Sequence, residues 1–220
     1  MSYKAYIFDL DGTILDSMDV WKNIDIEFLG KRNLPYTEEY AKALSSMKLN
    51  IAAEYTIKLY GLKEEPQDII NEWLNMAKEA FAYKVGLKPY AKELLEVLHK
   101  NKIPAAVATT SQKELYLPAL KRNGILHFFD AIADSDMVSR GKDSPDIFLH
   151  AAKLLNQKPC DCIVFEDTAA GIRSAKSAGF TVAAVIDGEF EAKHAEIREM
   201  ADFTACDFEK FYRELEKATV

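Results

Sequence analysis

The sequence predicts an α/β fold in which a doubly wound parallel sheet carries a helical insertion after its first strand. Three observations predict this fold. Short, nearly continuous apolar runs recur along the chain, segments of helical periodicity separate them, and one long stretch after the first run has helical periodicity alone. Strands that are buried on both faces have such continuous runs, and intervening helices return the chain for parallel pairing.

Four apolar runs are the predicted strands of the sheet: residues 3–8, 104–108, 162–165 and 181–186. The segments between them have helical spacing. In one of these segments Leu94, Leu95 and Leu98 repeat at intervals that place them on one face of a helix. Strands and helices that alternate in this way form parallel sheets with helices on both faces.

Residues 17–85 interrupt this alternation. No run in this stretch has the composition of a strand, whereas Trp21, Ile24 and Phe28 fall on one face of a helix and further amphipathic segments follow. Residues 61–66 begin with glycine and end with proline, which predicts a turn inside the stretch. We therefore expect a helical insertion directly after the first strand.

The insertion divides the chain into two predicted domains. Gly86 and Pro89 mark the return to the sheet. Residues 1–16 and 86–220 then form the α/β core domain, and residues 17–85 form the helical domain. A chain of 220 residues is long enough for a core with an accessory module, since domains commonly have about 100–200 residues.

The composition is that of a folded globular protein. Apolar residues make up 49% of the chain and charged residues 29%, which is too rich in apolar side chains for a disordered chain. The net charge is −7 and the charges are dispersed, so the chain lacks the basic face of a nucleic-acid-binding protein. The amino terminus has only a short apolar run that ends at an acid, unlike a signal peptide or a transmembrane span. We expect a cytoplasmic protein without a nucleic-acid or membrane partner, and the sequence leaves its oligomeric state open.

The three cysteines, Cys160, Cys162 and Cys206, are predicted to be reduced. Cys160 and Cys162 lie too close in sequence for an ordinary disulfide between two elements, and disulfides are rare in cytosolic proteins. One C-x-C pair alone also supplies too few ligands for a metal site.

Two acids follow the first predicted strand. Asp9 and Asp11 lie in the run FDLDGT, at the carboxyl end of a strand, where open α/β sheets bind their ligands. Residues two apart in an extended chain point the same way, so both carboxylates can face one pocket. Two acids this close repel each other unless a cation or a shared proton relieves them, which predicts a divalent metal. The same fragment also fits a plain strand end with an Asp-Gly turn, so the later motifs decide between the two.

Hydroxyl and lysine side chains at two later turns are candidate phosphate ligands. Thr109 and Thr110 follow the second predicted strand, where hydroxyl and backbone N–H groups can hold phosphate oxygens, although threonine is also a common helix cap. Lys142 precedes Pro145, which suits the first turn of a helix. Its compact ammonium can neutralise a phosphate and a carboxylate together. We predict that Thr109, Thr110 and Lys142 bind phosphate.

A second acid pair, Glu166 and Asp167, ends the third predicted strand. Acids that end apolar strands pack poorly, but their oxygens are good ligands for a hard cation such as Mg²⁺. Together with Asp9 and Asp11, this pair predicts a magnesium site at the edge of the sheet.

This ordered set of motifs resembles the haloacid-dehalogenase-like (HAD) phosphohydrolases over essentially the whole chain. The four family motifs are matched in order by Asp9 with Asp11, Thr109, Lys142, and Glu166 with Asp167. Within the superfamily the chain is most similar to the β-phosphoglucomutase-like branch, in the runs FFDAIADS, SPDIF and FEDTAAGI. The resemblance implies a Rossmann-like core, and it implies that the helical insertion is the cap domain of that superfamily.

The resemblance also implies a role for each motif. Asp9 would be the nucleophile that forms an aspartyl phosphate. Asp11 would be the general acid/base, which protonates the leaving oxygen and then deprotonates the attacking water. Asp167 would be a magnesium ligand, and Glu166 a further ligand or the partner of one. Thr109 and Lys142 would bind the phosphate.

We therefore expect a magnesium-dependent phosphatase that hydrolyses a small phosphorylated metabolite through an aspartyl-phosphate intermediate. The alternative is a sugar phosphomutase of the β-phosphoglucomutase type. Carbon–halogen hydrolysis is disfavoured because displacement of a halide does not need the acid/base that Asp11 provides. A binding protein without activity is disfavoured because the set of motif residues is complete.

Two departures from the pattern of the branch, both in the cap, bear on the choice between phosphatase and mutase, and a third lies beside the phosphate-binding lysine. Trp21 stands where the sugar phosphomutases carry a histidine, and the run Met47-Lys48-Leu49-Asn50 stands near their cap arginine. Asp143 follows Lys142 where related sequences usually have a proline. Because an indole only donates and neither Leu49 nor Lys48 offers a guanidinium fork, the two departures in the cap favour the phosphatase. The additional acid Asp143 would weaken phosphate binding by Lys142.

Overall fold

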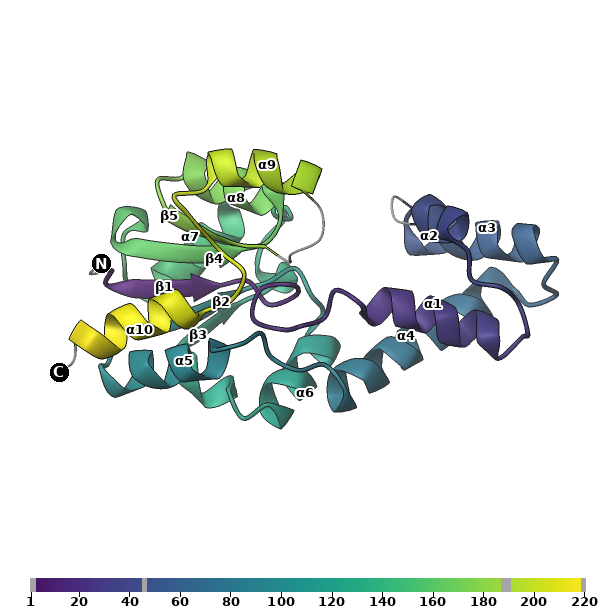
Figure 1. Ribbon diagram of the computed structural model, residues 1–220, viewed down its shortest axis with the longest axis horizontal. Helices are drawn as coiled ribbons and strands as arrows, with labels where there is room; N and C mark the ends of the chain where they lie inside the picture. The colour runs from purple at the N-terminus through teal and green to yellow at the C-terminus, as the bar shows by residue number, and fades with distance from the viewer. Residues whose placement is uncertain (1–2, 45–46, 187–190, 219–220) are drawn as a thin grey trace. The chain divides into compact units, whose positions relative to one another are not determined.

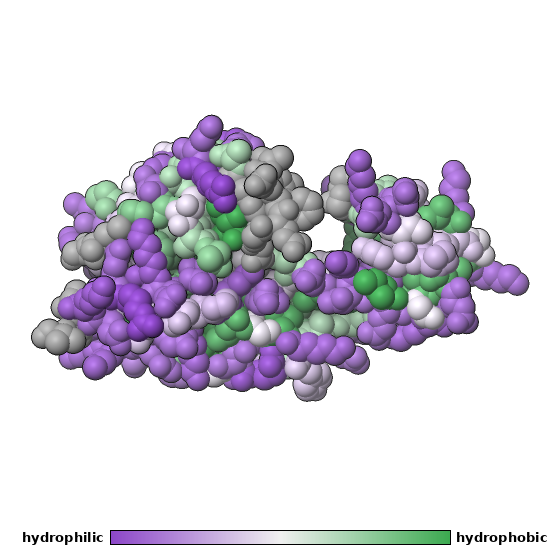
Figure 2. Space-filling model, in the orientation of Figure 1, coloured by the Kyte–Doolittle hydropathy of each residue, from purple (hydrophilic) through white to green (hydrophobic). Residues whose placement is uncertain are grey.

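A computed structural model describes residues 3–44, 47–186 and 191–218 of the chain. The chain divides into two compact units, a core unit of Met1–Ser17 with Gly86–Val220 and a helical unit of Met18–Val85. Hydrophilic residues cover most of the face of each unit that Figure 2 shows. Within the described ranges, no helix has the length and apolar content needed to cross a membrane.

Six parallel strands form the sheet of the core unit (Figure 1). They are β1 (Ala5–Phe8), β2 (Ala105–Ala108), β3 (Ala131–Ala133), β4 (Cys162–Glu166), β5 (Thr181–Val185) and β6 (Phe203–Ala205). Their order is β3-β2-β1-β4-β5-β6, so the chain builds outwards from β1 on one side and then crosses to build outwards from it on the other. The predicted fold class, a doubly wound parallel sheet, is confirmed.

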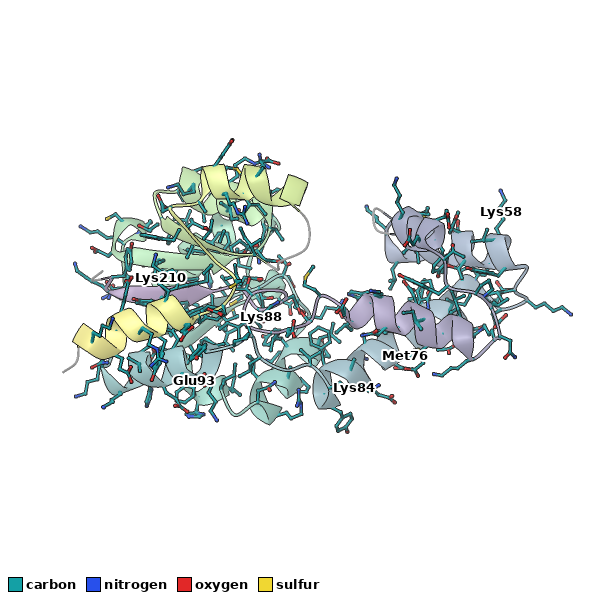
Figure 3. All side chains as sticks on the ribbon, in the orientation of Figure 1. Lys58, Met76, Lys84, Lys88, Glu93 and Lys210 are labelled. Carbon is teal, nitrogen blue, oxygen red and sulfur yellow. The ribbon has the colours of Figure 1, made fainter. Side chains whose placement is uncertain are left out.

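Helices cover both faces of this sheet. The core unit contains α5 (Ala91–Lys100), α6 (Lys113–Arg122), α7 (Asp146–Leu154), α8 (Ala169–Ser177), α9 (Glu191–Met200) and α10 (Glu209–Ala218), with short 3₁₀ turns at Leu126–Phe128, Ser135–Met137 and Pro159–Asp161. In Figure 1, α5 and α10 lie on one side of the sheet, and α8 and α9 lie on the other. On α5 the predicted apolar face is buried, while Glu93 is exposed on the opposite face (Figure 3).

Alternate side chains of β1 supply the two halves of the core, because successive residues of a strand point to opposite faces. Ala5 and Ile7 pack into an apolar cluster with Ile147 and Phe148 of α7. Tyr6 and Phe8 point the other way and stack against Phe165 of β4. Since β1 is fully buried between these two layers, the residue that follows it is held in a fixed position at the carboxyl edge of the sheet.

The two strands that the sequence analysis missed are the edge strands β3 and β6. Each has three residues, and Phe203–Ala205 in β6 is only partly buried. An edge strand lacks a neighbour on one side, so it needs no continuous apolar run. The periodicity that revealed the four inner strands is therefore absent from both.

The helical unit consists of α1 (Val20–Gly30), α2 (Glu38–Leu44), α3 (Leu49–Tyr60) and α4 (Pro66–Tyr83). The predicted turn lies between α3, which ends at Gly61 with a φ of 65°, and Pro66 at the start of α4. Phe28 of α1 is buried against Trp73 of α4, with ring centroids 5.4 Å apart. Exposed side chains such as Lys58 extend from the outside of the unit (Figure 3).

Candidate active site

The predicted site residues lie at the carboxyl edge of the three central strands. Strand order reverses between β1 and β4, and ligands of doubly wound sheets bind beyond this switch point. Asp9 follows β1 directly, and its N–H donates to the carbonyl of Phe165 in β4 at 2.9 Å. Glu166 is the last residue of β4, so parallel pairing alone brings two acids that are 157 residues apart to the same edge.

Lys142 joins these two acids. Its ammonium forms an ion pair with Oδ1 of Asp9 and a second one with Oε2 of Glu166 at 2.6 Å. All three side chains are shielded from solvent, with exposed fractions of 12% for Lys142, 4% for Asp9 and 0% for Glu166. Charge-assisted hydrogen bonds of this kind are strong and directional, so the amine of Lys142 is fixed beside Asp9.

The first turn of α8 holds the carboxylate of Glu166. Oε1 accepts from the N–H of Thr168 at 3.1 Å and from its hydroxyl at 2.5 Å. The same hydroxyl accepts from the N–H of Gly171 at 3.1 Å, so Thr168 also caps the helix. A Cβ added at Gly171 would lie 2.6 Å from Oε1 of Glu166 and still closer to its Cδ, so only glycine leaves room for this carboxylate.

We expect that Gly171→Ala displaces Glu166. The substitution should lower the free energy of unfolding by about 1–3 kcal/mol, because the added methyl group overpacks a site with no free volume. Activity should fall with it, because Glu166 positions Lys142. Gly30→Ala is the matched control, since Gly30 is also helical and its added Cβ has no atom within 4 Å. Chemical denaturation of both variants checks this, and equal stability of the two would contradict it.

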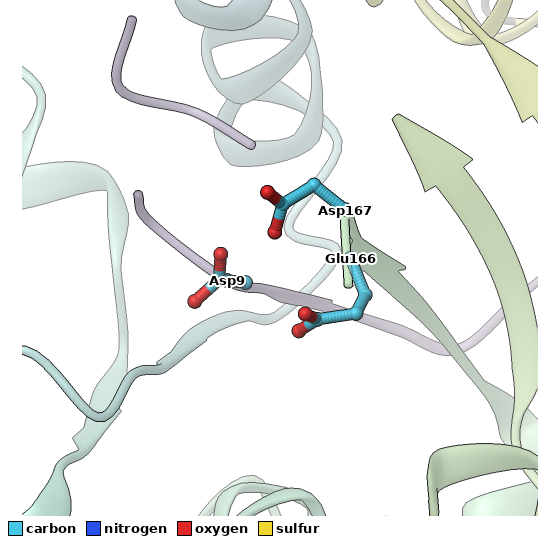
Figure 4. A group of neighbouring side chains, drawn as sticks. All are labelled: Asp9, Glu166 and Asp167. Atoms are coloured by element: carbon cyan, nitrogen blue, oxygen red, sulfur yellow. The ribbon is translucent and has the colours of Figure 1, made fainter. Parts of the chain in front are cut away.

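Asp167 completes a group of three acids with the geometry of a metal site. One carboxyl oxygen each from Asp9, Glu166 and Asp167 lies within 4.8 Å of the other two. Figure 4 shows the side chains of Glu166 and Asp167 reaching from the end of β4 towards Asp9. Oδ1 of Asp167 is buried and has no hydrogen-bond partner among the described residues. An unpartnered anionic oxygen in a cluster of acids fits a hard divalent cation, which takes carboxylate oxygens as ligands.

The protonation behaviour of the cluster is that of a cation-binding site. Burial raises the pKa of Asp9 well above its usual range, Lys142 opposes this, and Glu166 and Asp167 add to it. Burial, together with the charge of Glu166, raises the pKa of Asp167 to about 7. Burial alone would lower the pKa of Lys142, but Asp9 and Glu166 outweigh it and raise that pKa. One ammonium therefore leaves the carboxyl groups of Asp9, Glu166 and Asp167 short of positive charge.

Asp11 lies outside this group of three acids. Its Oδ1 accepts from the hydroxyl of Ser17 at 2.8 Å, and the same hydroxyl accepts from the N–H of Gly12 at 3.2 Å. Gly12 has a φ of 78°, which turns the chain directly after Asp11. Ser17 thereby fixes the direction of the Asp11 carboxylate. The metal role predicted for Asp11 stays a prediction.

Thr109 and Thr110 differ in their surroundings. Thr109 is buried at the end of β2, beside β1, and its hydroxyl accepts from the N–H of Ser111 at 3.0 Å. This bond leaves the hydroxyl hydrogen free to donate, which suits a phosphate oxygen. Thr110 is exposed. Asp143, the additional acid beside Lys142, is also exposed.

Sequence reasoning missed three residues that shape the site: Ser17, Thr168 and Gly171. Thr168 carries a usable signal, because threonine ahead of a small-residue helical run is a common helix cap. The contacts of Ser17 and Gly171 follow from loop geometry and close packing, which leave no periodic trace in the sequence.

The model of the haloacid dehalogenase-like hydrolase family matches residues 3–179 of the chain. The chain belongs to this family. This HAD hydrolase is 31% identical over 177 residues to fructose-1-phosphate phosphatase YqaB of Escherichia coli (strain K12). The match covers 80% of this chain and 93% of the relative. It is also 31% identical over 199 residues to β-phosphoglucomutase of Bacillus subtilis (strain 168), which covers 84% of each chain.

A solved structure supports the same assignment. A crystal structure from Thermotoga maritima, assigned to a β-phosphoglucomutase, has a TM-score of 0.87 and 25% sequence identity, and the match covers 97% of this chain and 98% of that one. The resemblance predicted from the four motifs is thus confirmed. With relatives named as phosphatases, this HAD hydrolase is a phosphohydrolase enzyme.

Proposed function

We propose that this HAD hydrolase is a magnesium-dependent phosphatase that hydrolyses a small phosphorylated metabolite through an aspartyl-phosphate intermediate on Asp9. One observation carries the proposal. The buried carboxylate of Asp9 lies between a fixed cation, Lys142, and an acid with an unpartnered oxygen, Asp167. Phosphoryl transfer depends mostly on positioning and charge neutralisation, and this arrangement provides both around one nucleophile.

The reaction divides into two displacements. In the first, a carboxylate oxygen of Asp9 bonds to phosphorus while the bond from phosphorus to the leaving oxygen breaks, and Asp11 donates its proton to that oxygen. In the second, the carboxylate of Asp11 takes a proton from water, whose oxygen displaces Asp9 from phosphorus. The hydrogen bond from Ser17 directs Asp11 through both steps. Phosphate leaves and both acids return to their first state.

Lys142, Thr109 and the acids divide the binding tasks. The ammonium of Lys142 favours the ionised form of Asp9 and attracts the phosphate, and the Thr109 hydroxyl donates to a phosphate oxygen. Asp9 and Asp167 would hold magnesium, while Glu166 holds Lys142 in place and contributes charge to the metal site. When bound, magnesium offsets the charge of the phosphoryl group and of the carboxylates. The helical unit, as the cap of the family, would contribute residues that select the substrate.

The relatives support a phosphatase or a mutase, and the helical unit favours the phosphatase. Trp21 and Leu49 both line a pocket of that unit. Because one side chain is an indole and the other is aliphatic, neither position offers a titrating imidazole or a guanidinium fork. A mutase has to shield its phosphoaspartate from water while a sugar intermediate reorients, which requires such groups in its cap.

The deciding experiment incubates the protein with β-glucose 1-phosphate, magnesium and a trace of the bisphosphate. We expect release of free phosphate to exceed formation of glucose 6-phosphate. A panel of phosphorylated metabolites, assayed with magnesium and with a chelator, then ranks the substrates. Efficient glucose 6-phosphate formation with little free phosphate would establish the mutase instead.

Asp167→Ala should raise the magnesium requirement by about 10–100-fold or more, because it deletes an anionic ligand oxygen. Glu166→Ala should raise it less and should lower turnover through Lys142. In the wild type, the magnesium requirement should also rise as pH falls below about 7, because the proton on Asp167 then competes with the metal. Activity titrated with magnesium at several pH values measures both effects. An unchanged requirement in Asp167→Ala would remove this residue from the metal site.

A further inference from the structure

The core unit has an exposed apolar patch at α7. Within the described part of this unit, three large hydrophobic side chains are exposed, and all three lie on α7 or in the segment that precedes it. They are Met137, Leu149 and Leu154, with exposed fractions of 50%, 39% and 48%. Met137 and Leu149 line a hollow of about 370 Å³ together with Val138. Apolar side chains scattered singly are ordinary on a surface, whereas their gathering around one hollow indicates a contact surface.

The face of α7 that lines this hollow has an acid at one end and a base at the other. Its four residues are spaced i, i+3, i+4 and i+7, which places them on one side of a helix: Asp146, Leu149, His150 and Lys153. Asp146 pairs with the exposed Arg140 at 3.0 Å, whereas Lys153 is exposed and has no ion pair with any residue that the structure describes. Because seven residues of helix rise by about 10.5 Å, the acid and the unpaired base lie two turns apart.

We propose that this face of α7 is a self-association surface, on which a second copy of the chain packs its own α7 antiparallel, about a two-fold axis between Leu149 and His150. A two-fold contact uses the same surface of both copies, so every contact occurs twice. In this register Asp146 meets the second copy's Lys153 at both ends, and Leu149 meets His150 in the middle. Arg140 stays beside Asp146, so each acid is shared between two cations.

The order of charges along the face is the argument for a second copy as its occupant. When the face is turned end to end and laid on itself, acid lies opposite base at both ends, which a two-fold contact requires and a partner of another sequence does not. The antiparallel arrangement also sets the amino end of one helix beside the carboxyl end of the other, which favours their dipoles. Two helical turns with the adjoining segment bury less than the about 800 Å² per partner of a standard interface, so we expect a weak dimer with a Kd on the order of 10–100 µM.

Sedimentation velocity at protein concentrations from about 5 to about 500 µM measures this association. We expect the mass of the wild type to rise from that of a monomer towards that of a dimer. Leu149→Glu places an unpaired charge at the centre of the contact and should weaken dimerisation by about tenfold or more. Lys121→Glu is the matched control, since Lys121 is exposed on α6 and should leave dimerisation unchanged. Circular dichroism and thermal melting verify that each variant is folded.

Charge reversal tests the two-fold register. Lys153→Glu sets two acids against each other at both ends of the contact, and Asp146→Lys sets two lysines against each other there. Each variant alone should therefore dimerise about tenfold more weakly than the wild type or worse, because like charges face each other twice. In an equimolar mixture of the two variants, acid meets base again at both ends. We expect this mixture to form a heterodimer with near wild-type affinity.

Three results would each overturn the self-association surface. The wild type could stay monomeric up to about 500 µM, which would leave the face to a partner of another sequence. Folded Leu149→Glu could dimerise as well as the wild type, which would place the dimer contact elsewhere. The mixed charge variants could fail to associate, which would exclude the antiparallel register. None of these measurements uses the phosphatase reaction, so their outcome does not depend on the function proposed above.

Discussion

We expect Asp9→Asn to remove turnover and to leave the protein folded. The amide keeps the shape of the side chain but cannot form the acyl phosphate, so the rate should fall by about 10⁴-fold or more. Stability should not fall with it. In the absence of metal the Asp9 carboxylate is buried beside two other acids, and removing its charge relieves that repulsion while Lys142 keeps its ion pair with Glu166.

Two measurements test this result. Magnesium-dependent hydrolysis of a chromogenic phosphate ester gives the rate, and denaturation in the presence of a chelator gives the free energy of unfolding. Asp143→Asn is the matched control, because it makes the same change at an exposed acid beside Lys142 and should retain near wild-type activity. Substantial turnover by folded Asp9→Asn, or labelled phosphate trapped on a different residue, would end the mechanism through Asp9.

Lys142→Ala is expected to lose both activity and stability. Deleting one partner of a buried ion pair leaves its counter-charges uncompensated, which costs about 3–5 kcal/mol of the free energy of unfolding. Here one ammonium serves two acids, Asp9 and Glu166, so both lose their partner at once. Hydrolysis should fall as well, because the same amine favours the ionised form of Asp9 and is proposed to attract the phosphate.

The loss of stability in Lys142→Ala should increase with pH. Lys142 lowers the pKa of Asp9, so its removal raises that pKa further above the value in the unfolded chain. A carboxyl whose pKa is higher in the folded state binds protons more tightly there. The free energy of unfolding therefore falls as pH rises from the pKa of the unfolded chain to the pKa of the folded protein. The deficit of Lys142→Ala should therefore be larger at about pH 8 than at about pH 5.

Denaturation curves at both pH values measure this difference. Lys92→Ala is the matched control, since Lys92 is exposed on α5 and should change stability little. Lys142→Met is a second variant that keeps most of the apolar stem and still lacks the charge. A deficit of equal size at both pH values would show that lost packing, and not unpaired buried charge, accounts for the effect.

The sequence by itself determined the fold class and the order of the motifs. Both are local properties. Strands β1, β2, β4 and β5 are buried on both faces and therefore needed continuous apolar runs, which the sequence displays. Because the carboxyl ends of parallel strands lie at one edge of a sheet, acids after β1 and at the end of β4 had to meet there. Asp9, Glu166 and Asp167 could be placed together for this reason.

Other features were decided by the tertiary structure alone. The short edge strands β3 and β6 form by pairing with an existing sheet, so they needed no pattern of their own. Glu166 was expected as a metal ligand or the partner of one, and only the packing of Lys142 against it shows that it also fixes the amine proposed to bind phosphate. Gly171 is required because a Cβ would occupy the place of the Glu166 carboxylate, which no local pattern records.

In the helical unit, too, some features could be predicted from the sequence and others depend on the tertiary structure. Periodicity predicted its helices, since burial of one face repeats along each of them. Asp25 and Trp73 lie on α1 and α4, 48 residues apart, and line one pocket only because these two helices pack together. Periodicity reports which face of a helix is buried, whereas the partner of that face, and the polar groups left unpaired beside it, depend on contacts between segments that are distant in the sequence.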